Sequence, residues 1–166
     1  MRIRITKGSE KDHIEVIRHD GSIETTTFPK KGLLPHDVVH LVVESKLQFE
    51  TGFWGRVADG ANPEDVGAVA IAGGHRSSSR AQTPREDIVE LIQAERIVEC
   101  FEAEMWSEAS DLDNFIGVLG AACSQSHVRS PELSAQNLSD IRKELSTLLV
   151  RWQKLEKGGS LTLDWK

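Results

Sequence analysis

Apolar and polar residues alternate along the first 28 residues, which is the period of a half-buried β-strand. The alternation runs through residues 2–6, 13–18 and 23–27. An Asp-Gly pair at residues 20–21 separates the last two runs, and this dipeptide is typical of a tight hairpin turn. The sequence therefore predicts a three-stranded antiparallel meander over this segment.

A second alternating run closes the chain. Leu161, Leu163 and Trp165 alternate with Thr162 and Asp164. An isolated strand is not stable in water, so it needs neighbours to pair with. We expect this strand to join the N-terminal meander as its fourth member.

The segment between Leu33 and Phe49 follows a helical period instead. Pro35 suits the first position of a helix, and Gly52 lies beyond its expected end. Apolar residues cover two faces of this helix, which is typical of a helix packed on both sides within a core. Four polar residues share one arc of about 100°, and they are His36, Asp37, His40 and Glu44.

Further helices are predicted in the rest of the chain. A short one is expected at the adjacent aromatic residues Phe53 and Trp54, and longer ones near residues 83–106, 110–122 and 131–157. Residues 72–83 are rich in Gly, Ser and Arg, and we expect them to form a mobile loop. Together these elements predict a single α+β domain over residues 1–166, in which the meander and the C-terminal strand pack against four or five helices.

Charge and composition narrow the function classes. The net charge is −6 and the pI is about 5.5, whereas nucleic-acid binding needs a concentrated cationic surface. The N-terminus lacks the apolar core of a signal peptide, and no apolar run reaches the ~18 residues of a membrane span. Cys100 and Cys123 show no metal or redox spacing, which favours buried thiols. We therefore expect a cytoplasmic protein that binds neither nucleic acid nor membrane.

The polar stripe could hold a divalent metal ion. His36 and His40 lie one helical turn apart, about 6 Å along the axis, a spacing that lets two imidazoles share one ion. Asp37 could orient a histidine or act as a ligand, so the candidate metal residues are His36, Asp37 and His40. Glu44 lies about 12 Å beyond His36 along the axis. A further ligand would come from elsewhere in the chain, with Glu95, Glu99, His75 and His127 as candidates.

The same stripe also has a structural explanation. Asp37 in the first turn complements the helix dipole. His40 and Glu44 form an ordinary i, i+4 pair. His36, next to Pro35, can simply be solvated. Both explanations remain open at this point.

A contact function is the other hypothesis. Trp54 belongs to a pair of adjacent aromatic residues, and Arg76 and Arg80 form a small basic cluster in an acidic chain. These three residues are the binding candidates for an unidentified protein partner or a second copy of the chain. The aromatic pair can instead anchor a short helix to the core, which is the interpretation we favour.

Three motifs resemble a conserved bacterial family of unassigned function. They are the run from Leu34 to Glu44, the Gly-Phe-Trp-Gly motif at residues 52–55, and the ending at residues 158–165. This resemblance covers most of the chain and implies a shared fold without an activity.

Separately, the five residues 36–40 are similar to the HDxxH zinc motif of the ubiquinone-biosynthesis assembly proteins. That resemblance implies zinc binding. The family's downstream acidic ligand would fall at Gly52, with Glu50 as the nearest substitute, and the family is essentially helical.

The sequence thus leads to two functional hypotheses. The first is a bacterial protein of unassigned function that acts through protein–protein contacts. The alternative is a metal-binding protein or metal-dependent enzyme centred on the stripe at residues 36–40.

Overall fold

The computed structural model describes residues 1–72, 84–107 and 111–165. Almost all of the predicted loop at residues 72–83 lies outside the described residues, including His75, Arg76 and Arg80.

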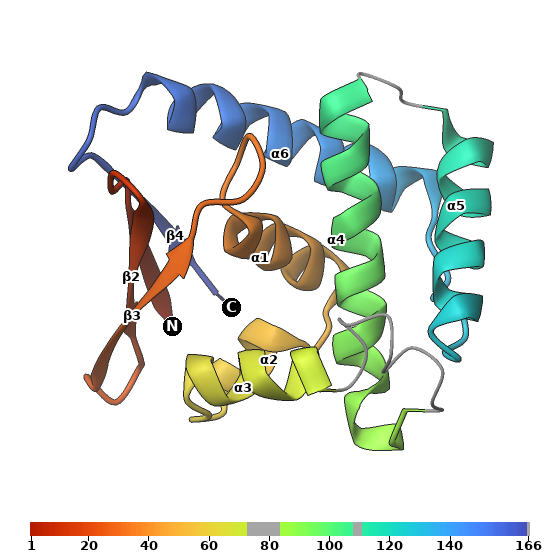
Figure 1. The fold of residues 1–166 in the computed structure, drawn as a ribbon, viewed down its shortest axis with the longest axis horizontal. Coiled ribbons are helices and arrows are strands. Elements are labelled where there is room, and N and C mark those ends of the chain that lie inside the picture. The colour runs from red at the N-terminus through yellow and green to blue at the C-terminus, as the bar shows by residue number, and fades with distance from the viewer. Residues whose placement is uncertain (73–83, 108–110, 166) are drawn as a thin grey trace.

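The strands form one antiparallel sheet in the order β3-β2-β1-β4 (Figure 1). Residue Ile3 pairs with Val16 on one side and with Leu163 on the other, so apolar residues of neighbouring strands share one face. This arrangement confirms the predicted meander and the addition of the C-terminal strand to it. The strands are β1 (Arg2–Thr6), β2 (Lys11–Ile17), β3 (Ile23–Pro29) and β4 (Ser160–Asp164).

The turn between β2 and β3 explains the Asp-Gly pair. Gly21 adopts a φ of 84°, in the left-handed region that favours glycine. The Asp20 carboxylate accepts hydrogen bonds from the backbone N–H and the hydroxyl of Ser22. Both features stabilise the reversal of the chain locally, without help from the rest of the fold.

Six α-helices are found among the described residues, one more than the upper limit expected from the sequence. The additional helix is α3, which contributes only small or medium apolar residues such as Val66 and Ala70 to the core. Its start carries a clear signal, because the Asn62 side chain accepts from Glu64 N–H and Pro63 occupies the first turn. The helices are α1 (His36–Leu47), α2 (Phe53–Ala58), α3 (Pro63–Ala70), α4 (Val89–Ser107), α5 (Leu112–Gln125) and α6 (Ala135–Lys154), and the 3₁₀ turn η2 (Glu86–Ile88) precedes α4.

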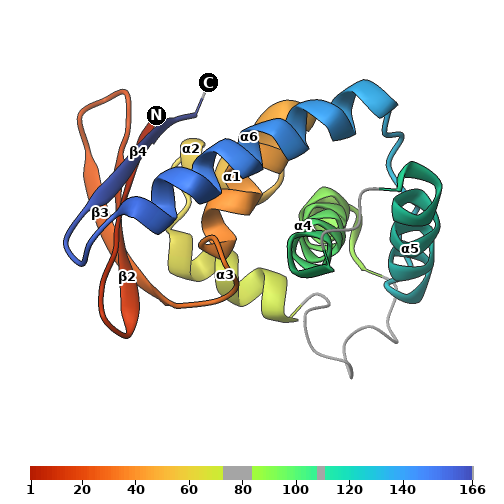
Figure 2. The ribbon, with the colours of Figure 1, turned by 90° about the horizontal axis from the view of Figure 1, so that it is seen from above.

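Helix α1 occupies the centre of the molecule. It packs against α2, α4 and α6, while the sheet lies to one side (Figure 1). Helix α5 packs against α4 on the side of the molecule that faces away from the sheet, as Figures 1 and 2 show. The apolar side chains of α1 are buried on both predicted faces, and they are Val38, Val39, Leu41, Val42 and Val43. None of the described helices is long and apolar enough to cross a membrane.

The role of β4 can be tested at Leu161, whose side chain is only 2% exposed. We expect Leu161→Ala to lower the free energy of unfolding by about 2–5 kcal/mol, because it removes buried contacts and leaves a cavity. The control is Thr162→Ala on the exposed face of the same strand, with an expected change within about 0.5 kcal/mol. Urea denaturation measures both variants, and equal losses would contradict a packed role for β4.

Candidate metal centre

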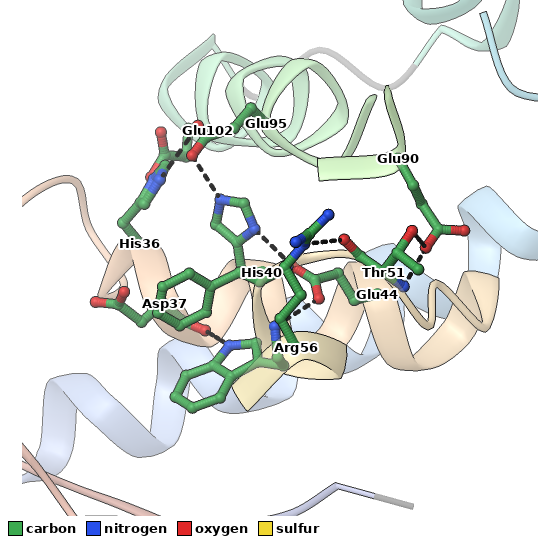
Figure 3. Close-up of polar contacts among 11 residues, drawn as sticks. His36, Asp37, His40, Glu44, Thr51, Arg56, Glu90, Glu95 and Glu102 are labelled. Carbon is green, nitrogen blue, oxygen red and sulfur yellow. Dashed lines mark hydrogen bonds and ion pairs between the residues drawn. The ribbon is translucent and has the colours of Figure 1, made fainter. Parts of the chain in front are cut away.

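The polar stripe of α1 faces helix α4. The rings of His36 and His40 lie with their centroids 4.7 Å apart, and Glu95 of α4 approaches both of them (Figure 3). His40 and Glu95 are 3% and 8% exposed, while His36 is partly buried. The helical spacing places the two imidazoles on one side, and the packing of α1 on α4 supplies the carboxylate.

Three ligand atoms converge at this point. The His36 Nε2 atom lies 3.7 Å from Glu95 Oε2, and the His40 Nε2 atom lies 3.5 Å from Glu95 Oε1. One ligand atom from each of the three residues lies within 4.8 Å of the others. Tetrahedral ligands at bond lengths of about 2.1 Å are about 3.4 Å apart, and each imidazole Nε2 lies near that distance from one of the two Glu95 oxygens.

The other nitrogen of each ring is held by a second carboxylate. His36 Nδ1 lies 2.9 Å from Glu102 Oε1, and His40 Nδ1 lies 2.9 Å from Glu44 Oε1. When each Nδ1–H donates to its carboxylate, the lone pair of each Nε2 atom is directed toward Glu95. Such outer carboxylates fix the ring orientation of metal-binding histidines and raise their basicity.

Glu44 also connects the site to the fold. Its side chain is fully buried and accepts the backbone N–H groups of Phe53 and Trp54 at the start of α2, in addition to bonding His40. A Cβ atom at Gly52 would lie 2.5 Å from Glu44 Oε2. The expected His40–Glu44 pair is therefore present, and it depends on the absence of a side chain at Gly52.

A second set of contacts holds the α1–α2 connection against the start of α4. The backbone N–H and hydroxyl of Thr51 donate to the Glu90 carboxylate. Arg56 donates through Nε to the Thr51 carbonyl at 2.8 Å (Figure 3). Its Nη2 group donates to the Asp87 carbonyl. These bonds help to set the distance between α1 and α4, and hence between the histidines and Glu95.

The charges around the rings favour protonated imidazoles in the metal-free protein. Burial alone would lower the pKa of His40, but the Glu95 and Glu44 carboxylates outweigh it and raise this pKa to about 10. Burial likewise opposes the charged form of His36, while hydrogen bonds with Glu102 and Glu95 leave its pKa raised. A bound cation could replace the positive charge of a protonated His40.

A pocket of about 380 Å³ opens onto the cluster. Its wall is formed by residues of β3 and the segment after it, together with residues of α1, α2, α3 and α4 and the end of α3. The lining residues are Phe28, Pro29, Lys31, His36, Asp37, His40, Phe53, Gly67, Ala70, Ile71 and Glu95.

Asp37 is not one of the three converging residues. Its carboxylate points away from His40 and Glu95, and its backbone carbonyl accepts the indole N–H of Trp54 at 2.9 Å (Figure 3). Consecutive residues on a helix are about 100° apart, which accounts for the divergence of Asp37 from its neighbour His36. Burial raises the pKa of the Asp37 carboxyl, against the opposing charges of the two histidines.

Trp54 does not occupy the surface position expected for a contact residue. Its side chain is 0% exposed, because the start of α2 is drawn onto α1 by Glu44 and by the indole bond to Asp37. This supports the interpretation of the aromatic pair as a core anchor. The other two binding candidates, Arg76 and Arg80, lie outside the described residues.

The outcome for the additional ligand candidates is mixed. Glu95 joins the two histidines, whereas Glu99 pairs with Arg96 and the exposed His127 lies beyond the end of α5. Glu102, which was not among these candidates, forms the hydrogen bond with His36 Nδ1. Its i, i+7 spacing from Glu95 on one helix is the sequence signal that could have paired them.

Comparison with known proteins leaves the site to be interpreted from its geometry alone. No family model, no curated protein and no solved structure matches this chain.

The raised pKa of His40 predicts a pH dependence of stability in the presence of a chelator. The folded pKa of about 10 exceeds the unfolded value of 6.5, so the contribution is fully present below about pH 6.5 and is lost as pH rises through about 10. The difference in unfolding free energy between wild type and His40→Gln should therefore shrink over this range. Urea denaturation at a series of pH values measures this difference, and His13→Gln at an exposed position is the control. A difference that stays constant with pH would contradict a protonated His40 in the folded protein.

The close approach at Gly52 predicts a second effect. Gly52→Ala should cost about 1–3 kcal/mol of unfolding free energy, because the new methyl group displaces a carboxylate that is held by three donors. In contrast, a Cβ at Gly117 in α5 meets no atom within 4 Å, so Gly117→Ala should be neutral or slightly stabilising. Thermal or urea unfolding compares the two variants. An unchanged stability of Gly52→Ala would contradict the close packing of Gly52 against the Glu44 carboxylate.

Proposed function

We propose that this protein binds a divalent transition-metal ion through His36, His40 and Glu95. The convergence of two imidazole Nε2 atoms and a carboxylate inside a pocket is the observation that carries the proposal. Two histidines and one carboxylate form a common ligand set for zinc and for non-haem iron. Three protein ligands would leave a coordination position open, as catalytic metal sites require.

The outer carboxylates favour the proposal over a purely structural cluster. An ordinary surface ion pair would satisfy each histidine with one acid, whereas here each ring has one acid at Nδ1 and shares Glu95 at Nε2. In this arrangement the metal ligands would be His36, His40 and Glu95, and the Glu44 and Glu102 carboxylates would orient the two histidines. Metal binding needs neutral imidazoles, so a divalent cation would displace any proton held at the Nε2 atoms.

The hypothesis of protein–protein contacts has less support. Its candidate Trp54 is buried, and Arg76 and Arg80 lie outside the described residues. The exposed apolar residues Leu112 and Ile116, one turn apart on α5, are compatible with a contact surface, but nothing in the described structure shows what would cover them. Metal binding is therefore our conclusion.

Metal titration of tag-free protein after chelator treatment tests the proposal. Zn²⁺ should raise the melting temperature by mass action. Mn²⁺, Fe²⁺ and Ni²⁺ should do the same if the site binds them. Glu95→Gln and His40→Ala should each abolish the rise. Asp37→Asn should retain most of it, because Asp37 lies outside the converging set.

The Asp37 variant distinguishes two ligand sets. Loss of binding in Asp37→Asn with retention in Glu95→Gln would favour the set inferred from sequence alone, His36, Asp37 and His40. An unchanged melting temperature with all four ions, and no metal retained after dialysis, would overturn the proposal altogether.

A further inference from the structure

The pocket beside the proposed metal centre has a distinct shape and chemistry. One wall is aromatic: the Phe28 and Phe53 centroids lie 6.3 Å apart in an edge-to-face arrangement, and Phe53 lies 6.1 Å from the His40 ring. A continuous row of rings therefore leads from β3 to the cluster. Such a wall packs favourably against a flat apolar group.

Another part of the lining consists of small or aliphatic residues of α3 and its end, namely Gly67, Ala70 and Ile71. A Cβ atom at Gly67 would meet no atom within 4 Å. A side chain at this lining position would therefore have open space to enter. The volume of about 380 Å³ falls at the lower end of the usual range for small-molecule sites.

The polar lining residues are His36, His40 and Glu95 of the cluster, together with Asp37 and the exposed Lys31, and the remaining lining residues are apolar or lack a side chain. A ligand that fits this distribution has a polar head for the metal and a compact apolar body against the apolar lining. A purely polar ligand would leave the apolar lining uncovered.

We infer that the pocket selects small molecules in which an anionic metal-binding group is attached directly to a compact aromatic body. This inference rests on the proposed metal site, because the head group needs the ion, but it adds a ligand class that metal binding alone does not specify. The rings of Phe28 and Phe53 would contact the aromatic body. Gly67 and Ala70 would contact it as well.

Two hydroxamates with the same head group test the inference on the zinc-loaded full chain. Benzohydroxamate carries a phenyl body, and acetohydroxamate carries only a methyl group. Burial of the phenyl ring should make benzohydroxamate bind roughly 10- to 100-fold more tightly, as measured by calorimetry. Equal affinities would overturn the inference.

Gly67→Leu supplies the matched steric test. The larger side chain has room to form, suits a helix better than glycine, and would extend into the open space at this lining position. It should remove most of the advantage of benzohydroxamate while leaving zinc content and acetohydroxamate affinity unchanged. Ala68→Leu, on the exposed side of the same helix, is the control and should retain the advantage.

The outcomes separate the two proposals. If the protein retains no zinc after dialysis, the metal proposal fails and this inference fails with it. If zinc is bound but the two hydroxamates bind equally, or Gly67→Leu leaves their ratio unchanged, only the inference about the aromatic body is overturned.

Discussion

The buried carboxylate of Glu44 is the interaction on which the arrangement of the helices depends. A carboxylate without water needs its hydrogen bonds supplied by the protein, and Glu44 obtains them from His40 and from the first backbone N–H groups of α2. These bonds fix where α2 begins relative to α1. The same bonds orient the His40 ring, so the local fold and the candidate site share one residue.

The buried Glu44 carboxylate also constrains the residues that pack around it. Gly52 must lack a side chain because the carboxylate occupies the space that a Cβ would need. Phe53 and Trp54 follow at once, so the start of α2 buries both aromatic rings against α1. Phe53 then forms part of the pocket wall beside the two histidines. A single buried charge therefore positions a helix, an aromatic wall and one imidazole.

The second half of the site comes from α4, and its placement depends on contacts remote from the histidines. Thr51 and Arg56 bind the start of α4 through Glu90 and Asp87. Glu95 and Glu102 lie further along the same helix, two turns apart. Because a helix is stiff over this length, anchoring its start also sets the position of both carboxylates relative to α1.

The sequence by itself determined the sheet and the main helices, because their signals are local. Strand alternation, the Asp-Gly turn and the two-sided apolar pattern of α1 each act over a few residues and agree with the packing that results. The sequence also placed His36 and His40 on one side of α1, since the helical period alone decides that. Helix α3 was missed although Asn62 and Pro63 mark its start, because its apolar residues are small and sparse.

Only the tertiary structure decided which carboxylates meet those histidines. Glu95 and Glu102 are about sixty residues away along the chain. Their i, i+7 spacing puts them on one face of α4, but it does not show which helix that face contacts. Asp37 was a candidate ligand because it is adjacent to His36 in sequence, whereas its carboxylate points away from His40 and Glu95 in the structure, since adjacent helical residues diverge by about 100°. Burial of Trp54 was decided in the same way, by the bonds from Glu44 and Asp37 that draw α2 onto α1. Contacts between distant segments depend on how the helices pack, and helix packing depends on side chains throughout the core.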